Sequence, residues 1–158
     1  VVAGDFDADG RDDLALAGGE GWQSVPVAFA SADGSFRVAN KEFPGSWPRW
    51  AETDNVRTLA GDFNRDGRAD LALVGGAGWQ SIPLALSAGE GSFTVQNQPI
   101  DARWNEWATT PGAEPVAGDF NGDRAADIAL VGGNTFNTQP VAVSNSDGTF
   151  ALVNEQLR

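Results

Sequence analysis

The sequence predicts an all-β protein, a β-propeller with three four-stranded blades in the chain. Three observations carry this prediction. First, short apolar runs alternate with Gly-rich turns, and no segment shows a helical period. Second, each unit ends in a strand that opens with a phenylalanine: Phe36, Phe93 and Phe150. Third, the motif Ala-Gly-Asp-Phe recurs every 57 residues, starting at Ala3, Ala60 and Ala117.

The first unit shows how each element is predicted. Val1 to Gly4 is a short apolar strand, and Asp5 to Asp13 is a polar loop. Leu14 to Ala17 and Val25 to Ala30 are further strands, and Phe36 to Val38 alternates as a fourth. The register places blades at about 1–40, 58–97 and 115–154, with connectors 41–57 and 98–114, all in one domain over 1–158.

Composition excludes several classes of function. The chain has 158 residues, of which 41% are hydrophobic, so a folded domain is expected. No apolar run is long enough for a membrane span. The absence of Cys and His excludes disulfides, thiolate or imidazole metal sites and a Ser-His dyad. A net charge of −12 argues against nucleic acid as a partner.

Each Ala-Gly-Asp-Phe motif leads into an Asp-rich loop that fits Ca²⁺. The first loop reads D-x-D-x-D-G-x-x-D, so alternate oxygen side chains can point at one centre. The seventh position would add a backbone carbonyl, and Mg²⁺ suits so many carboxylates less well. The expected ligands are Asp5, Asp7, Asp9, Arg11 and Asp13, then Asp62, Asn64, Asp66, Arg68 and Asp70, then Asp119, Asn121, Asp123, Ala125 and Asp127.

The alternative for these loops is a set of metal-free Asx-turns. Three copies in register favour a cation, because clustered carboxylates repel one another without one. Loop three departs from the pattern, since Arg124 replaces a glycine and is penalised if the turn needs positive φ. Asp12 stands where the other loops have Ala69 and Ala126, and we interpret it as a solvated charge.

These motifs resemble a known family. Ala-Gly-Asp-Phe-(Asn/Asp)-x-Asp-Gly-x-x-Asp resembles the FG-GAP/VCBS repeat of integrin α-subunit propellers. The 57-residue period, Gly-Trp-Gln-Ser-(Val/Ile)-Pro and the Trp-bearing connectors are similar to the branch that holds the Psathyrella velutina lectin and its bacterial relatives. That branch implies seven four-stranded blades, Ca²⁺ in some of them, and N-acetylglucosamine-type sites between neighbouring blades. This chain departs from it with three blades and with Thr135-Phe136-Asn137-Thr138 in place of Gly-Trp-Gln-Ser.

The tryptophans are the candidates for sugar contacts, because an aromatic face packs against the apolar face of a sugar ring. The alternative is that they are packing wedges between blades. In each connector pair, Trp47/Trp50 and Trp104/Trp107, we expect one residue to pack and the other to bind. The candidate residues are Trp22, Gln23, Ser24, Trp47, Arg49, Trp50, Trp79, Gln80, Ser81, Trp104, Asn105 and Trp107.

The blade 1–2 site would combine Trp47, Arg49 and Trp50 with groups from Trp22 or Trp79. The blade 2–3 site would combine Trp104, Asn105 and Trp107 with Trp79 or Phe136, and Phe lacks the indole donor.

Three functions compete at this point. The resemblance favours a secreted lectin for N-acetylglucosamine-type glycans on a Ca²⁺-stabilised scaffold. An integrin-like protein-adhesion propeller would use a broad loop face instead of pockets. An enzyme is disfavoured, because no non-repeating acids form a convincing catalytic pair: Glu20, Glu42, Glu52, Asp54, Asp101, Glu106 and Glu114.

The number of blades bears on the partners. Propellers typically close with about four to eight blades, so three would leave two apolar faces open. We expect a homo-oligomer, with a dimer that closes a six-bladed ring favoured. The alternative is a fragment of a seven-bladed protein.

Overall fold

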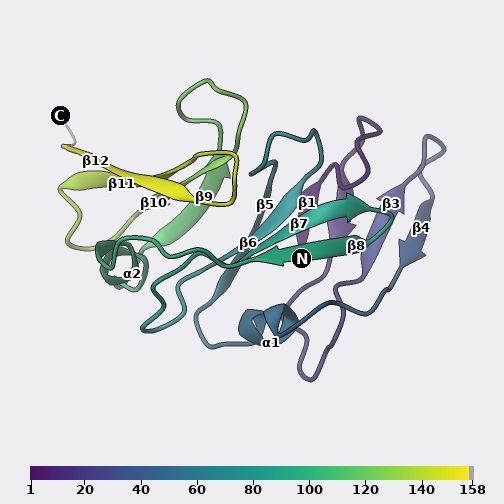
Figure 1. Cartoon of the computed structure of the whole chain (residues 1–158), viewed down its shortest axis with the longest axis horizontal. Coiled ribbons are helices and arrows are strands. Elements are labelled where there is room, and N and C mark those ends of the chain that lie inside the picture. Colours follow the sequence, from purple (N-terminus) through teal and green to yellow (C-terminus); the bar gives the residue numbers. More distant parts are fainter. Residues whose placement is uncertain (157–158) are drawn as a thin grey trace.

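The computed structural model describes residues 1–156 and contains three four-stranded antiparallel sheets (Figure 1). Each sheet keeps its four strands in chain order, as propeller blades do, which confirms the all-β propeller prediction. Blade 1 holds β1 (Val2–Gly4), β2 (Asp13–Ala15), β3 (Val27–Ala30) and β4 (Phe36–Ala39). Blade 2 holds β5 (Arg57–Gly61), β6 (Asp70–Val74), β7 (Leu84–Gly89) and β8 (Ser92–Gln96). Blade 3 holds β9 (Glu114–Gly118), β10 (Asp127–Val131), β11 (Thr138–Ser144) and β12 (Phe150–Gln156).

Each connector contains a short helix that the sequence analysis did not expect. These helices are α1 (Trp47–Ala51) and α2 (Arg103–Ala108). The prediction of no helix was wrong because five or six residues are too few to show a period. Within residues 1–156, no helix is long and apolar enough to cross a membrane.

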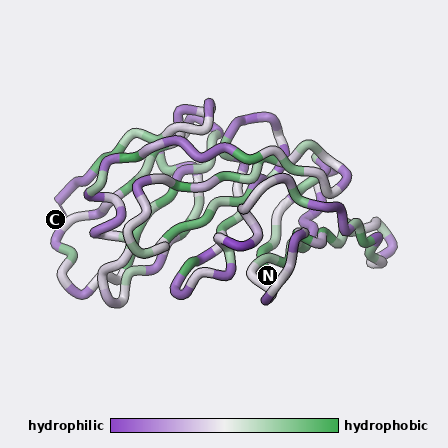
Figure 2. Tube along the Cα trace, turned by 60° about the horizontal axis from the view of Figure 1, so that its bottom comes forward, coloured by the Kyte–Doolittle hydropathy of each residue, from purple (hydrophilic) through white to green (hydrophobic). Residues whose placement is uncertain are grey.

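The two hydrophobic cores lie between neighbouring blades. Hydrophobic stretches of the chain run through the middle of the molecule, and many of the outer loops are hydrophilic (Figure 2). In the first core, Phe6 and Val27 of blade 1 meet Leu71 and Phe93 of blade 2. The second core repeats this arrangement one blade further on, with Phe63 and Leu84 against Ile128 and Phe150. At each of these two junctions, the trailing face of one blade packs on the leading face of the next.

Polar contacts fix the same junction. The Ala69 N–H donates to the Asp5 carbonyl at 2.6 Å, and the Ser87 hydroxyl donates to the Phe6 carbonyl at 2.9 Å. Gly4 allows this approach, because a Cβ there would lie 2.6 Å from the Cβ of Ala69. The second junction repeats these bonds, from the Ala126 N–H to the Asp62 carbonyl at 2.8 Å and from the Ser144 hydroxyl to the Phe63 carbonyl at 2.8 Å.

The two ends of each blade carry different residues. The Asp-rich loops join the first and second strands at one end, the upper end in Figure 1. The turns after the second strand and both connector helices lie at the opposite end. The antiparallel strand order thus separates the predicted metal loops from the tryptophans.

Candidate metal loops and aromatic pockets

The first Asp loop gathers three carboxylates around one point. Single oxygens of Asp5, Asp7 and Asp13 lie within 4.8 Å of one another. Oδ1 of Asp7 is buried and has no hydrogen-bond partner among the described residues. Burial, followed by the charges of Asp13 and Asp5, raises the pKa of the Asp7 carboxyl. A buried oxygen without a partner, next to two other carboxylates, fits a divalent cation with oxygen ligands.

The last carboxylate of each loop has a structural role that the sequence analysis did not identify. The buried Asp13 accepts the Phe6 N–H at 3.0 Å and the Ala30 N–H at 2.8 Å, which fastens the loop base to β3. Asp70 and Asp127 make the corresponding two bonds in blades 2 and 3. Burial is the main cause that raises the pKa of Asp70, to about 7.

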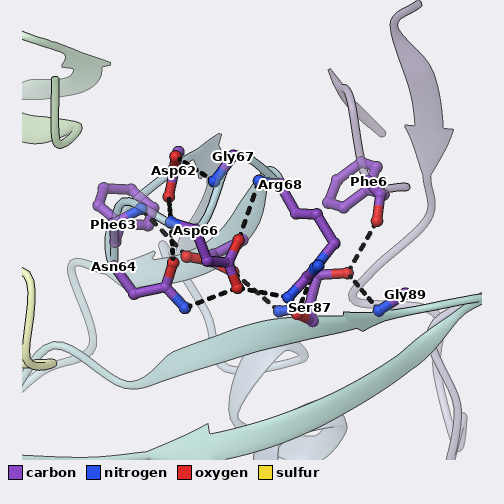
Figure 3. A network of polar contacts seen from close by, with 10 residues as sticks. Phe6, Asp62, Phe63, Asn64, Asp66, Gly67, Arg68, Ser87 and Gly89 are labelled. Carbon is purple, nitrogen blue, oxygen red and sulfur yellow. Dashed lines mark hydrogen bonds and ion pairs between the residues drawn. The ribbon is translucent and has the colours of Figure 1, made fainter. Parts of the chain in front are cut away.

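The second loop shows how the fifth and seventh positions cooperate (Figure 3). Nη2 of Arg68 lies 2.7 Å from Oδ2 of Asp66, and Nε of Arg68 donates to the Ser87 carbonyl at 3.0 Å. Arg11 pairs with Asp9 in the same way in loop one. Only the backbone carbonyls of these arginines were expected to contribute, whereas their side chains also brace each loop against the third strand.

Loop three lacks this brace, because Ala125 occupies the arginine position. Arg124 has φ +77°, where Gly10 has +85° and Gly67 has +86°. The turn therefore needs positive φ at this position, and a non-glycine residue there is strained.

The structure separates the two tryptophans of each connector. Trp47 is fully buried, stacks on Phe43 with ring centroids 5.3 Å apart, and donates from Nε1 to the Pro83 carbonyl at 3.3 Å. Trp104 is 2% exposed in the second core. Neither ring has an exposed face for a sugar, although both were named among the candidate contacts. The first tryptophan of each pair packs, which leaves Trp50 and Trp107, both partly exposed, as candidates.

Trp50 reaches the Gly-Trp turn of the next blade. It lines a cavity of about 270 Å³ together with Trp79, Gln80 and Ser81, and also with Pro83 and Asn97. The indole of Trp79 lies directly over Gly76, where any Cβ would collide with the ring. Gly76, the second glycine of the Gly-Gly pair, is therefore required for this ring position. Asn97 was not predicted, although the sequence carried a signal for it, because Asn40 and Asn154 stand at the same position of the other two repeats.

Arg49 and the Gly-Trp turn of blade 1 belong to a different cavity. Trp22, Gln23 and Arg49 line a space of about 300 Å³ with Glu42 and Phe43. Ser24 pairs with Glu42 through a backbone bridge instead. We expected Arg49 and Trp50 to share one site, but in the structure they line different cavities. Successive residues of α1 point to different sides.

Asn105 holds a turn and does not face the solvent as a free polar group. Its Oδ1 accepts the Gly78 N–H at 3.1 Å, and its Nδ2 donates to the Gly76 carbonyl at 2.7 Å. These bonds fix the turn that carries Trp79, so the prediction of a direct sugar contact is corrected to a supporting role. Trp107 and Phe136 each pack against the second core, and they occupy the positions that correspond to Trp50 and Trp79.

Comparison with known proteins agrees with this architecture. A family model described as an FG-GAP-like repeat matches residues 5–73 and 62–130. The chain belongs to the FG-GAP-like repeat family.

A solved structure of an Agrocybe aegerita lectin, described as showing specific recognition of non-reducing terminal N-acetylglucosamine, has a similar fold. The TM-score is 0.63 at 23% sequence identity, and the match covers 94% of this chain and 36% of the lectin chain. The chain thus spans about a third of that lectin. No curated protein matches the chain.

Proposed function

We propose that this FG-GAP-like propeller is a non-catalytic lectin that binds N-acetylglucosamine-type glycans in aromatic pockets between its blades. The observation that carries the proposal is the cavity shared by Trp50, from the connector, and Trp79, from the following blade. The similar fold of a lectin described as recognising terminal N-acetylglucosamine supports the choice of ligand.

The chemistry of this cavity suits a sugar. Two indole rings offer apolar surface and N–H donors, and Gln80, Ser81 and Asn97 supply amide and hydroxyl groups beside them. A volume of about 270 Å³ is close to the lower end for small-ligand sites. The corresponding blade 2–3 position has Phe136 in place of an indole, so binding there is expected to be weaker.

The Asp loops would hold Ca²⁺ away from the sugar. Asp5, Asp7 and Asp13 are the side chains best placed for it in loop one. Bound Ca²⁺ would supply positive charge that offsets the repulsion among these carboxylates. Because the loops and the pockets lie at opposite ends of the blades, this role is structural. Extracellular Ca²⁺ concentrations suit modest sites of this kind, so we propose a secreted protein.

We also propose that two copies close one six-bladed ring. Exposed apolar side chains on blade 1 (Phe36 and Val38) and on blade 3 (Val116 and Phe120) support self-association.

Isothermal titration with N-acetylglucosamine and a terminal-N-acetylglucosamine oligosaccharide tests the lectin proposal. We expect the wild-type protein to bind these sugars. Trp50→Ala or Trp79→Ala should each lower the affinity at least about tenfold, a loss of about 1.4 kcal/mol of binding free energy. Trp22→Ala is the matched control, because Trp22 lines the other cavity. Absence of binding to any such glycan by the folded protein would refute the proposal and favour a protein-adhesion module.

A further inference from the structure

The seventh position of loop two (62–70) supplies a cation from the chain itself. The Arg68 guanidinium lies 2.7 Å from the Asp66 carboxylate and donates from Nε to the Ser87 carbonyl on β7 at 3.0 Å (Figure 3). The Arg68 N–H and the Asn64 side-chain amide donate to the same carboxylate, at 2.9 Å and 3.1 Å. Asp66 therefore has three donors, one of them charged, and the loop is tied to the third strand of its blade.

Loop one repeats this arrangement. Arg11 pairs with Asp9, and its Nε donates to the Ala30 carbonyl on β3 at 3.0 Å. The side chains of Asp9 and Asp66 are each 28% exposed, so both ion pairs are partly withdrawn from water and should contribute more than a fully exposed pair. Loop one also holds a fourth carboxylate, Asp7, where the other loops have asparagine. Loops two and three are therefore the matched pair.

Loop three (119–127) has the carboxylates of loop two but no arginine at the seventh position. Ala125 stands there, so Asp123 keeps two donors, the Ala125 N–H at 2.7 Å and the Asn121 side-chain amide at 3.0 Å. Neither donor is charged. An alanine side chain has no N–H group, so the tie from this position to the third strand is missing as well. The repulsion among the carboxylates is thus offset less in loop three than in loop two.

Backbone conformation does not account for a difference between these two loops. Each loop holds one glycine and one other residue at positive φ. They are Arg65 (+62°) and Gly67 (+86°) in loop two, and Gly122 (+81°) and Arg124 (+77°) in loop three. The strain of a non-glycine residue at positive φ is therefore present once in each loop. The residue at the seventh position is what separates them.

We propose that Arg68 acts as a built-in cation that keeps loop two ordered in the absence of metal, and that loop three, which has no such arginine, depends on bound Ca²⁺ for its order. The second part rests on the proposed Ca²⁺ binding. In loop three, Ca²⁺ would supply the positive charge that the guanidinium supplies in loop two. Removal of Ca²⁺ should therefore loosen the loop end of blade 3 before that of blade 2.

Hydrogen exchange of the full chain, measured by NMR in EDTA and then in Ca²⁺, tests this inference. Two equivalent amides are the probes: the Gly67 N–H donates to Asp62 at 2.8 Å, and the Arg124 N–H donates to Asp119 at 2.9 Å. In EDTA, we expect the protection factor of the Arg124 amide to be at least about tenfold below that of the Gly67 amide. Adding Ca²⁺ should raise the protection of Arg124 to that of Gly67.

Variants of loop two separate the charge of Arg68 from its size. Ala125 is fully buried, so the test removes the arginine of loop two instead of adding one to loop three. In EDTA, Arg68→Gln should lower the protection of the Gly67 amide about tenfold, and Arg68→Lys should retain part of it, because lysine keeps the positive charge. Protection of the β6 amides reports that blade 2 stays folded. Arg103→Ala, which removes an exposed arginine at the connector end, should leave loop two unchanged.

The outcomes separate the two parts of the inference. Equal protection of the Gly67 and Arg124 amides in EDTA overturns the role of Arg68, and so does a loss in Arg68→Lys as large as that in Arg68→Gln. If the two loops differ in EDTA but Ca²⁺ leaves the Arg124 amide unprotected, the calcium dependence of loop three is refuted while the built-in cation stands. None of these measurements involves a sugar, so failure of the lectin proposal would not change them.

Discussion

Each blade is fastened by different chemistry at its two ends. At the loop end, carboxylates hold backbone N–H groups, as Asp70 holds those of Phe63 and Ser87. At the connector end, aromatic rings pack, as Trp47 does against Phe43. The stability contributed by the loop end should therefore depend on cations and on pH. At the connector end, stability and sugar binding should depend on the size of the aromatic side chains.

The largest effect should come from the buried tryptophan of the first connector. Trp47→Ala should lower the free energy of unfolding by about 3–5 kcal/mol, because it empties a fully enclosed site. Trp50→Ala should cost clearly less stability but lower N-acetylglucosamine affinity, because its ring lines the pocket. Urea denaturation and calorimetric titration measure the two effects. Equal stability losses in the two variants would contradict the division of roles within the pair.

The next largest effect should come from the carboxylate clamp at the loop end. Asp70→Ala removes the acceptor of two N–H groups, so the free energy of unfolding should fall by about 2–4 kcal/mol. Asp54→Ala, an exposed carboxylate at the connector end, should change it by less than about 0.5 kcal/mol. Urea denaturation in EDTA removes any contribution of Ca²⁺ from this comparison. A change at Asp70 as small as that at Asp54 would show that the clamp is dispensable.

Calcium should act on stability and leave sugar binding alone. At free Ca²⁺ about a hundred times the dissociation constant, each occupied loop adds about 2.7 kcal/mol to the free energy of unfolding. Thermal unfolding with Ca²⁺ or EDTA measures this gain. Asp7→Ala should remove the part of this Ca²⁺-dependent gain that comes from loop one, because it deletes the carboxylate oxygen that has no hydrogen-bond partner. Loss of N-acetylglucosamine binding in EDTA, with the fold intact, would show that the two ends are coupled.

The smallest effect should be a pH dependence of the metal-free protein. The pKa of Asp70 is raised from 3.8 to about 7 in the fold. The protonated carboxyl therefore adds to the free energy of unfolding at low pH, and this contribution is lost as pH rises through about 7. In EDTA, the free energy of unfolding should fall by about 1 kcal/mol between pH 6 and pH 8. Asp70→Asn should abolish this slope in urea denaturation at the two pH values, and an unchanged slope would assign it to another group.

The repeats made much of this structure predictable from the sequence. The alternation of short apolar runs and glycine turns is local, so the three blades and the positions of the Asp loops follow from spacing alone. The positive φ at Arg124 was likewise predictable, because Gly10 and Gly67 mark that position in the other loops.

Roles that depend on a neighbouring blade were not predictable. Nothing local distinguishes Trp47 from Trp50, since burial depends on which side of α1 meets the next blade. The separation of three residues within each tryptophan pair could have suggested a helical turn. The turn-holding amide of Asn105 has no counterpart in blade 1, where Pro48 stands, so the repeat gave no signal for it.

The ring of Trp79 lies on Gly76, which leaves it little freedom to rotate. A mobile side chain that must be ordered on binding reduces affinity by about 0.5–1.5 kcal/mol. The glycine would therefore favour the proposed sugar binding through conformational entropy, because the stacking surface would already be in place when the ligand arrives. Gly133 holds Phe136 in the same way in blade 3, so this preorganisation is retained even where the indole is replaced.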